Sequence, residues 1–131
     1  MGKSLYRIPH RLAEVIALIQ VLAIDIEAHR RESELLDELQ DKPKSATSWT
    51  QIAKEHRELF RYNKQKEIDG GPPISLIARH VTEKVNDIRE FPHDLTKKLI
   101  EIAILIHDKQ KKRAEWWKVW LPFVEIGRAH V

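Results

Sequence analysis

The chain has 131 residues, of which 42% are hydrophobic and 33% charged, and its 23 Lys and Arg residues exceed its 20 Asp and Glu residues by three. This length and balance predict one globular domain, and they exclude both a disordered chain and a strongly basic protein that coats nucleic acid. The sequence contains no cysteine, which excludes disulfides, thiol catalysis and cysteine-based zinc sites.

The first predicted element is an apolar helix over residues 12–26. Its apolar residues recur every three or four positions, as on one face of an α-helix: Leu12, Val15, Ile16, Ile19, Leu22, Ala23 and Ile26. The run is too short to cross a bilayer, which takes about 20 apolar residues, and Gln20 and Asp25 interrupt it. We therefore expect a buried core helix.

A second, shorter helix is expected from about Ser33 to Gln40. Ser33 is the predicted N-cap, because its hydroxyl can accept a hydrogen bond from the first turn. Lys42-Pro43 is expected to end the helix, since the residue before a proline is disfavoured in the helical region.

The third predicted helix has the clearest start. Ser48 and Gln51 have the spacing of a capping box, in which Ser48 accepts from the Gln51 N–H and the Gln51 side chain bonds back to Ser48. One face of this helix is predicted to carry Trp49, Ile52, Ala53, His56 and Phe60. On that face, His56 is interpreted as a core histidine rather than a metal ligand.

A β-hairpin is predicted after the third helix. Residues 60–63 and 74–81 favour strands, and Asp69-Gly-Gly-Pro-Pro73 between them is a strong turn signal. Three helices followed by a hairpin is the order of a winged helix. The predicted fold is therefore mainly α with one β-hairpin, a winged-helix-like domain over residues 1–92 followed by a long C-terminal helix.

That last helix is predicted after a loop over residues 82–92. Asp94 is its expected cap, and Leu95, Leu99, Ile102, Ala103 and Ile106 repeat at helical spacing. Residues 93–124 are interpreted as this helix leading into a truncated membrane segment.

Basic and aromatic residues crowd the end of the predicted helix. The expected membrane-interface residues are Lys109, Lys111, Lys112, Arg113, Trp116, Trp117 and Trp120. Cations just outside a spanning helix stay on the cytoplasmic side, and indole rings prefer the headgroup level. Two alternatives are a helix end that packs its Trp residues on its own domain, and an amphipathic anchor that lies in the headgroup region.

The last six residues, Ile126-Gly-Arg-Ala-His-Val131, resemble the translation of a common short-read sequencing adapter that is followed at once by a stop codon. Glu125 is accounted for by the two preceding adapter bases. Residues 125–131 are therefore interpreted as a non-native tail, and the native protein is expected to continue after Val124.

Several motifs resemble a group of short bacterial proteins of unknown function. They are Ile16-Ala-Leu-Ile-Gln-Val-Leu-Ala23, Ser48-Trp49, Ala53-Lys-Glu-His-Arg-Glu-Leu-Phe-Arg61, Ser75-Leu-Ile-Ala-Arg-His-Val81 and His107-Asp108. The resemblance covers nearly the whole stretch before residue 125. It implies a winged-helix-like cytoplasmic domain and a C-terminal transmembrane helix, and it carries no assigned activity.

No catalytic or metal-binding pattern is present in the sequence. There is no phosphate loop, no Gly-x-Ser-x-Gly elbow and no His-Glu-x-x-His helix, and the His residues lack ligand spacing. We therefore predict no enzyme activity, no cofactor, no metal and no small-molecule substrate.

Two functions fit these observations. The first is a cytoplasmic interaction module, held at the inner face of the membrane, that binds an unknown protein partner. The alternative is a winged-helix DNA-binding regulator, in which a helix and a wing contact bases and phosphates. The contact candidates are Thr50, Gln51, Lys54 and Arg57 on the outward face of the third helix, and Arg61, Lys64 and Lys66 in the wing. Four nearby acids disfavour contact with phosphates: Glu55, Glu58, Glu67 and Asp69.

Overall fold

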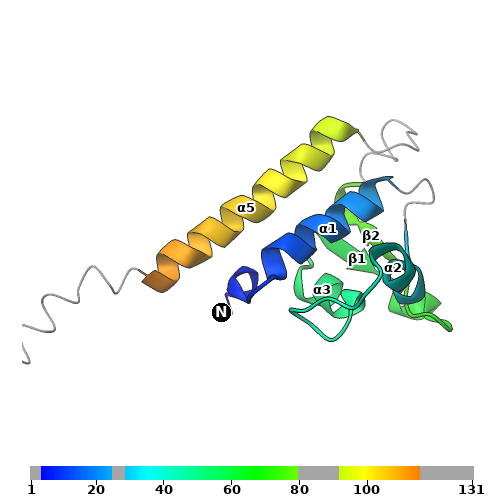
Figure 1. Cartoon of the computed structure of the whole chain (residues 1–131). Helices are drawn as coiled ribbons and strands as arrows, with labels where there is room; N and C mark the ends of the chain where they lie inside the picture. Colours follow the sequence, from blue (N-terminus) through cyan, green and yellow to red (C-terminus); the bar gives the residue numbers. More distant parts are fainter. Residues whose placement is uncertain (1–3, 25–28, 80–91, 116–131) are drawn as a thin grey trace, which may run out of the picture.

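The structure is a computed structural model that describes residues 4–24, 29–79 and 92–115 (Figure 1). The elements are η1 (Leu5–Arg7), α1 (Arg11–Ile24), α2 (Glu32–Leu39), α3 (Trp49–Glu55), β1 (Phe60–Tyr62), η2 (Lys64–Lys66), β2 (Ile74–Leu76) and α5 (His93–Glu115). Residues 77–79 are also helical. The predicted architecture, mainly helical with one hairpin and a long C-terminal helix, is confirmed.

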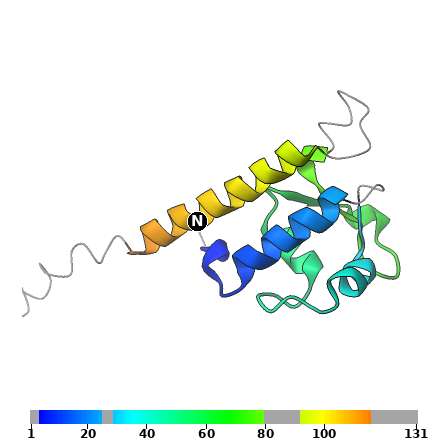
Figure 2. The same cartoon turned by 45° about the horizontal axis from the view of Figure 1, so that its top comes forward.

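Helix α1 is the centre of the hydrophobic core. Val15, Leu18, Ile19 and Leu22 are fully buried, and each such side chain contributes about 1.5–3 kcal/mol by leaving water. One side of α1 packs against α5, and other apolar residues of its core cluster come from α2, α3 and the hairpin (Figures 1 and 2). The prediction of a buried core helix is confirmed as far as Ile24; residues 25–28 lie outside the described residues.

Helix α2 begins one residue earlier than predicted, and the predicted cap is wrong. Arg31, not Ser33, is the N-cap, and its backbone N–H donates to the Glu34 side chain at 2.9 Å. Glu34 is three residues after Arg31, so its carboxylate can fold back onto the open end of the helix. The helix ends at Leu39, because Gln40 adopts the left-handed conformation (φ 65°) before Pro43 is reached.

The hairpin is short, and its second strand also pairs with the segment between α1 and α2. Strands β1 and β2 are antiparallel, with Arg61 opposite Ser75. Arg30, in the segment between α1 and α2, pairs with Ile74 through two backbone hydrogen bonds of 2.9 and 2.8 Å. The hairpin is thereby held against the start of α2. The predicted second strand over residues 74–81 is too long, since the chain turns helical at Ile77.

Two glycines shape the hairpin tip. Gly70 and Gly71 have φ values of +99° and +96°, a region that side chains with a Cβ rarely adopt. The predicted turn at Asp69-Gly-Gly-Pro-Pro73 therefore has a conformational basis.

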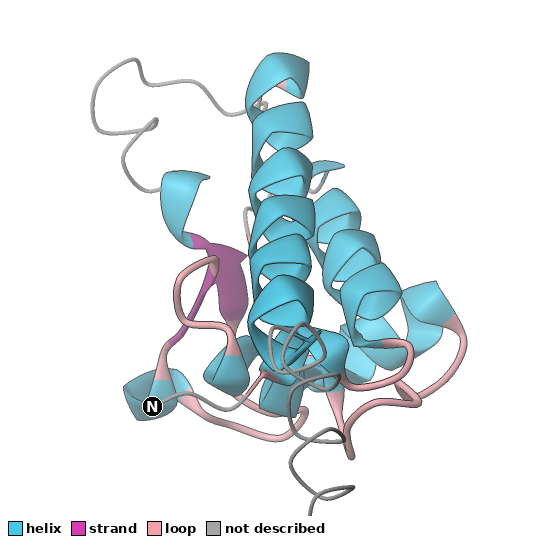
Figure 3. Ribbon diagram, turned by 90° about the vertical axis from the view of Figure 1, so that its left-hand side faces the viewer, coloured by secondary structure: helices cyan, strands magenta, loops and turns pink. Residues whose placement is uncertain are grey.

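Helix α5 extends for 23 residues, about 35 Å at 1.5 Å per residue, and runs alongside α1 (Figure 3). Leu99 and Ala103 belong to the common core, so α5 shares the core of the preceding residues although the predicted domain boundary falls at its start. The predicted cap Asp94 lies inside the first turn, because the helix already begins at His93. The predicted loop over residues 82–92 lies outside the described residues except for Pro92.

Candidate functional site

The start of α3 is capped as predicted, with one difference. Ser48 Oγ accepts from the Gln51 N–H at 3.0 Å. The Gln51 side chain does not return to Ser48; its Oε1 accepts from the backbone N–H of Thr47 at 2.9 Å and from the Thr47 hydroxyl. Gln51 is thus partly occupied in holding the turn before α3.

The predicted outward position of Thr50 is wrong. Thr50 is only 9% exposed, and it faces α2, where its hydroxyl and its N–H donate to Glu32 Oε1 at 2.8 and 2.7 Å. Glu32 Oε2 also accepts from the Trp49 N–H at 3.0 Å. A carboxylate is favourable here because the first N–H groups of a helix are unpaired and carry partial positive charge. It also places an acidic group where a DNA-reading helix would approach phosphates.

Helix α3 is shorter than predicted because His56 turns into the core. The helix ends at Glu55, and the N–H groups of Leu59 and Phe60 both donate to the His56 carbonyl at 3.0 Å. Phe60 therefore enters β1 instead of continuing the helical face, although it is fully buried as expected.

Lys54 and Arg57 come together over one aromatic ring. Lys54 Nζ lies 5.4 Å and Arg57 Cζ 5.5 Å from the centre of the Tyr62 ring, and both basic side chains are exposed. Cations over a tyrosine face are held by the ring quadrupole. This pair forms an exposed positive patch between the end of α3 and β1.

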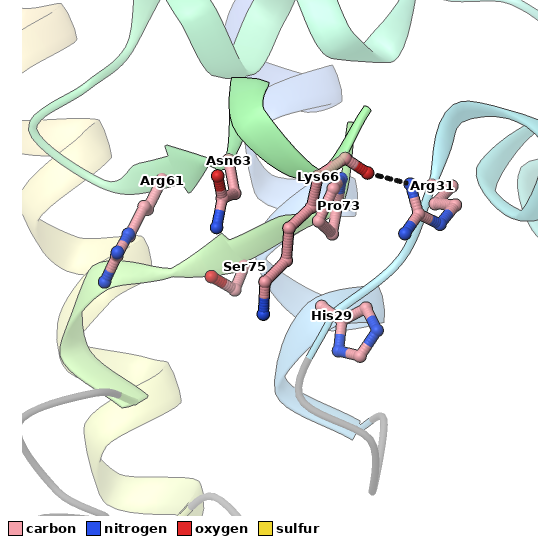
Figure 4. A pocket seen from close by; sticks show the side chains of 7 residues that line it. All are labelled: His29, Arg31, Arg61, Asn63, Lys66, Pro73 and Ser75. Carbon is pink, nitrogen blue, oxygen red and sulfur yellow. Dashed lines mark hydrogen bonds between the residues drawn. The ribbon is translucent and has the colours of Figure 1, made fainter. Parts of the chain in front are cut away.

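The wing candidates divide between two places. Arg61 and Lys66 line a pocket of about 400 Å³ on the other face of the hairpin, together with His29, Arg31, Asn63, Pro73 and Ser75 (Figure 4). Lys64 is exposed in η2 and does not line this pocket. The predicted contact set therefore does not form one surface.

A buried polar network was not predicted from the sequence. Arg11 is 1% exposed inside α1, and its guanidinium donates to His56 Nε2 at 3.1 Å and to the Ser45 carbonyl at 2.8 Å. It also pairs with the Glu55 carboxylate at 2.9 Å. An arginine in an apolar helix was the one local signal, but its partners lie far along the chain.

His56 is satisfied on both ring nitrogens. Arg11 can only donate, so His56 Nε2 accepts from it and the Nδ1–H donates to Glu58 Oε2 at 3.0 Å. The Tyr6 ring packs edge-on at 4.4 Å, and the Tyr6 hydroxyl donates to the same Glu58 oxygen at 2.6 Å. His56 is 1% exposed. The interpretation of His56 as a core histidine is confirmed.

Glu58 and a second acid, Glu14 in α1, have lowered pKa values. Burial raises the pKa of Glu58, but hydrogen bonds from His56 and Tyr6 outweigh burial and bring it below its ordinary value. For Glu14, burial is likewise outweighed by hydrogen bonds from the Ser45 hydroxyl and from the backbone of Lys44 and Ser45, so its pKa is lowered. Burial, with the nearby Glu58 carboxylate, raises the pKa of Tyr6.

The predicted membrane-interface residues are described only in part. Lys109, Lys111, Lys112 and Arg113 are exposed on the last turns of α5, while Trp116, Trp117 and Trp120 lie outside the described residues. Within the described ranges, no helix is long and apolar enough to cross a bilayer. In the same ranges, no group of three His, Cys, Asp or Glu residues is placed to hold a metal ion.

Comparisons of the chain with protein-family models, with curated proteins and with solved structures find no match. The resemblance to short bacterial proteins therefore stays a prediction.

Proposed function

We propose that this chain is a non-enzymatic interaction module that works at an anionic membrane surface, where the C-terminal turns of α5 hold it. One observation carries the proposal. Lys109, Lys111, Lys112 and Arg113 are exposed on the last turns of α5, and the C-terminal end of this helix extends past α1 (Figures 1 and 2).

The charge of this segment suits an anionic surface. Residues 108–113 hold these four cations and one carboxylate, Asp108, for a net charge of +3. Each Lys or Arg near an anionic bilayer contributes about 1 kcal/mol of attraction, and the cytoplasmic leaflet carries most of the anionic lipid. Trp116, Trp117 and Trp120 follow in the sequence, and indole rings favour the headgroup level.

Contacts with η1 and α1 fix the orientation of α5, and thus of its basic turns, relative to the rest of the domain. Gln110 Oε1 accepts from the Tyr6 N–H at 3.0 Å, and α5 packs along η1 and α1 up to this point. A membrane bound to the last turns of α5 would therefore meet the domain in a defined orientation, which leaves the hairpin and α2 free to contact a protein partner at the inner face of the membrane.

The test is vesicle co-sedimentation of the full chain. We expect the chain to bind vesicles of phosphatidylcholine with about 30% phosphatidylserine, whose negative surface potential resembles that of a cytoplasmic leaflet. It should bind little to vesicles of phosphatidylcholine alone. Replacing Lys109, Lys111, Lys112 and Arg113 together with Gln should lower the bound fraction at least about tenfold, since attraction scales with the cations near the surface.

A control variant can remove the same number of positive charges from other exposed lysines. Replacing Lys42, Lys44, Lys97 and Lys98 with Gln removes the same charge from other parts of the surface. This control should keep most of the binding. Equal losses in the two variants, or no preference of the wild-type chain for anionic vesicles, would contradict the proposal.

DNA binding is a second candidate, which the exposed pair of Lys54 and Arg57 over Tyr62 favours. The Glu32 carboxylate at the start of α3 disfavours it, as does the division of the basic candidates between two faces. Replacing Lys54 and Arg57 with Ala should weaken binding to duplex DNA of any sequence and reduce its salt dependence. Absence of binding by the wild-type chain at low salt would rule this candidate out.

A further inference from the structure

The pocket beside the hairpin is assembled from three segments of the chain. Arg61 and Ser75 are cross-strand partners, and because side chains alternate along a strand, they point away from the face that carries Phe60 and Tyr62. Figure 4 shows Arg61, Asn63 and Ser75 coming from the hairpin, and His29 and Arg31 from the segment that leads into α2. The pairing of Arg30 with Ile74 holds these segments together.

The described lining of the pocket is positively charged. Arg31, Arg61 and Lys66 contribute three cations, and none of the lining residues that the structure describes is acidic. Glu67 and Asp69 follow in the same loop but are exposed and do not line it. In the described part of the chain, none of the three cations forms an ion pair with a carboxylate.

Arg31 is held in place without losing its charge. Its Nη1 donates to the carbonyls of Lys66 at 3.0 Å and Gly71 at 2.5 Å, the first of which Figure 4 draws as a dashed line. Carbonyl oxygens orient a guanidinium but do not neutralise it. The fixed charge therefore remains available to an anion that enters the pocket.

We propose that this pocket binds the phosphomonoester group of a small phosphorylated molecule. Such a group carries nearly two negative charges at neutral pH and three acceptor oxygens, which suits a pocket lined by three cations better than a carboxylate or a phosphodiester with a single charge. A volume of about 400 Å³ lies in the range of small-molecule sites, so there is room for organic atoms beyond the phosphate.

This site is separate from the proposed membrane contact. The pocket lies on the hairpin and the segment before α2, whereas the basic turns of α5 lie at the other end of the molecule (Figure 1). The sequence alone predicted no small-molecule partner, because Arg31 and Arg61 are 30 positions apart and no local motif links them.

The experiment is calorimetric titration of the full chain with ribose 5-phosphate, inorganic phosphate and ribose. We expect ribose 5-phosphate to bind more tightly than inorganic phosphate, and ribose not to bind. Arg61→Gln with Lys66→Gln should raise the dissociation constant of ribose 5-phosphate at least about tenfold, because each charge-assisted hydrogen bond contributes about that factor. Both side chains are exposed, so the variant should fold, which circular dichroism will check.

The matched control is Arg57→Gln with Lys64→Gln, which removes the same two residue types from positions that do not line the pocket. It should change the dissociation constant less than about threefold, the size expected for exposed, solvent-screened charges that do not line the pocket. No binding of ribose 5-phosphate at millimolar concentration, or equal weakening in both double variants, would overturn the proposal. Binding of duplex DNA with the same loss in Arg61→Gln and Lys66→Gln, but none of ribose 5-phosphate, would assign the pocket to nucleic-acid phosphates instead and also overturn it.

Discussion

Glu32 joins the start of α2 to the start of α3, where its carboxylate accepts from the N–H of Trp49 and from the N–H and hydroxyl of Thr50. Two of these three donors are backbone N–H groups that a helix start otherwise leaves unpaired. This side chain therefore holds α3 against α2 and explains why Thr50 is not free to contact a partner.

Replacing Glu32 with Ala should lower the free energy of unfolding by about 2–3 kcal/mol, since hydrogen bonds to a charged group are lost and N–H groups are left unpaired. Urea denaturation followed by circular dichroism measures this. Glu67→Ala, at an exposed acid in the hairpin loop, should change it by less than about 0.5 kcal/mol. Similar values for the two variants would show that Glu32 does not stabilise α3.

We expect Tyr6 to make the free energy of unfolding depend on pH in the alkaline range. Its pKa is raised in the folded state, so the phenol stays protonated while the unfolded chain ionises above about pH 10. Its contribution to stability is complete below that pH and is lost as the pH rises toward the folded pKa. The free energy of unfolding should therefore fall by up to about 1.4 kcal/mol per pH unit from this residue alone.

The Tyr6→Phe variant should lose this slope and about 1 kcal/mol at neutral pH, because the hydrogen bond to Glu58 is removed. Urea midpoints measured between about pH 9 and 11 test this. The control is Tyr62→Phe, which retains Tyr6 and should retain the wild-type slope. A slope unchanged in Tyr6→Phe would mean that another group causes it.

At the scale of elements, α5 has two different apolar faces. Leu99 is 8% exposed and packs toward α1, whereas Leu105 is 54% exposed on the same helix. The buried face explains why the helix belongs to the core. The exposed residues do not contribute to that packing.

The same substitution on these two faces should have different effects. Leu99→Ala should lower the free energy of unfolding by about 2–5 kcal/mol, because it removes buried methyl groups and leaves a cavity. Leu105→Ala should lower it by less than about 1 kcal/mol, since most of the side chain is already in water. Chemical denaturation of both variants measures the difference, and equal losses would contradict the packing of α5 on α1.

At the scale of the whole molecule, two carboxylates connect segments that are distant in sequence. Glu58, after α3, contacts Tyr6 in η1, and Glu14 in α1 holds the backbone at Lys44 and Ser45. Both have pKa values lowered from the ordinary value by the hydrogen bonds that their carboxylates accept. Their contribution to stability is therefore present above the unfolded value, near pH 4.3, and is lost as the pH falls through the folded pKa values.

We expect the chain to lose stability progressively below about pH 4.3. The double variant Glu14→Gln with Glu58→Gln should be less stable at pH 7 and should depend less on pH in the acid range. Melting temperatures at neutral and acid pH measure both effects. The control pair Glu67→Gln with Glu101→Gln, at exposed positions, should keep the wild-type profile. An identical acid dependence in the first double variant would show that other groups control it.

The sequence by itself determined those features that depend on neighbours along the chain. Apolar residues at helical spacing predicted α1 and α5, because side chains three and four positions apart lie on one face of a helix. Ser48 predicted the start of α3, and the two glycines after Asp69 predicted the hairpin turn, since caps and turns involve residues only a few positions apart.

Only the tertiary structure decided where the polar side chains lie. Thr50 turns to α2 because Glu32, 18 positions earlier, accepts its hydrogen bonds. His56 is buried because Arg11, 45 positions earlier, reaches it. Arg31 and Arg61 line one pocket because backbone pairing brings the segment before α2 to the hairpin. A polar or charged side chain can be buried only where a partner compensates for its lost contact with water. When that partner lies in a distant segment, the local spacing of residues does not reveal it.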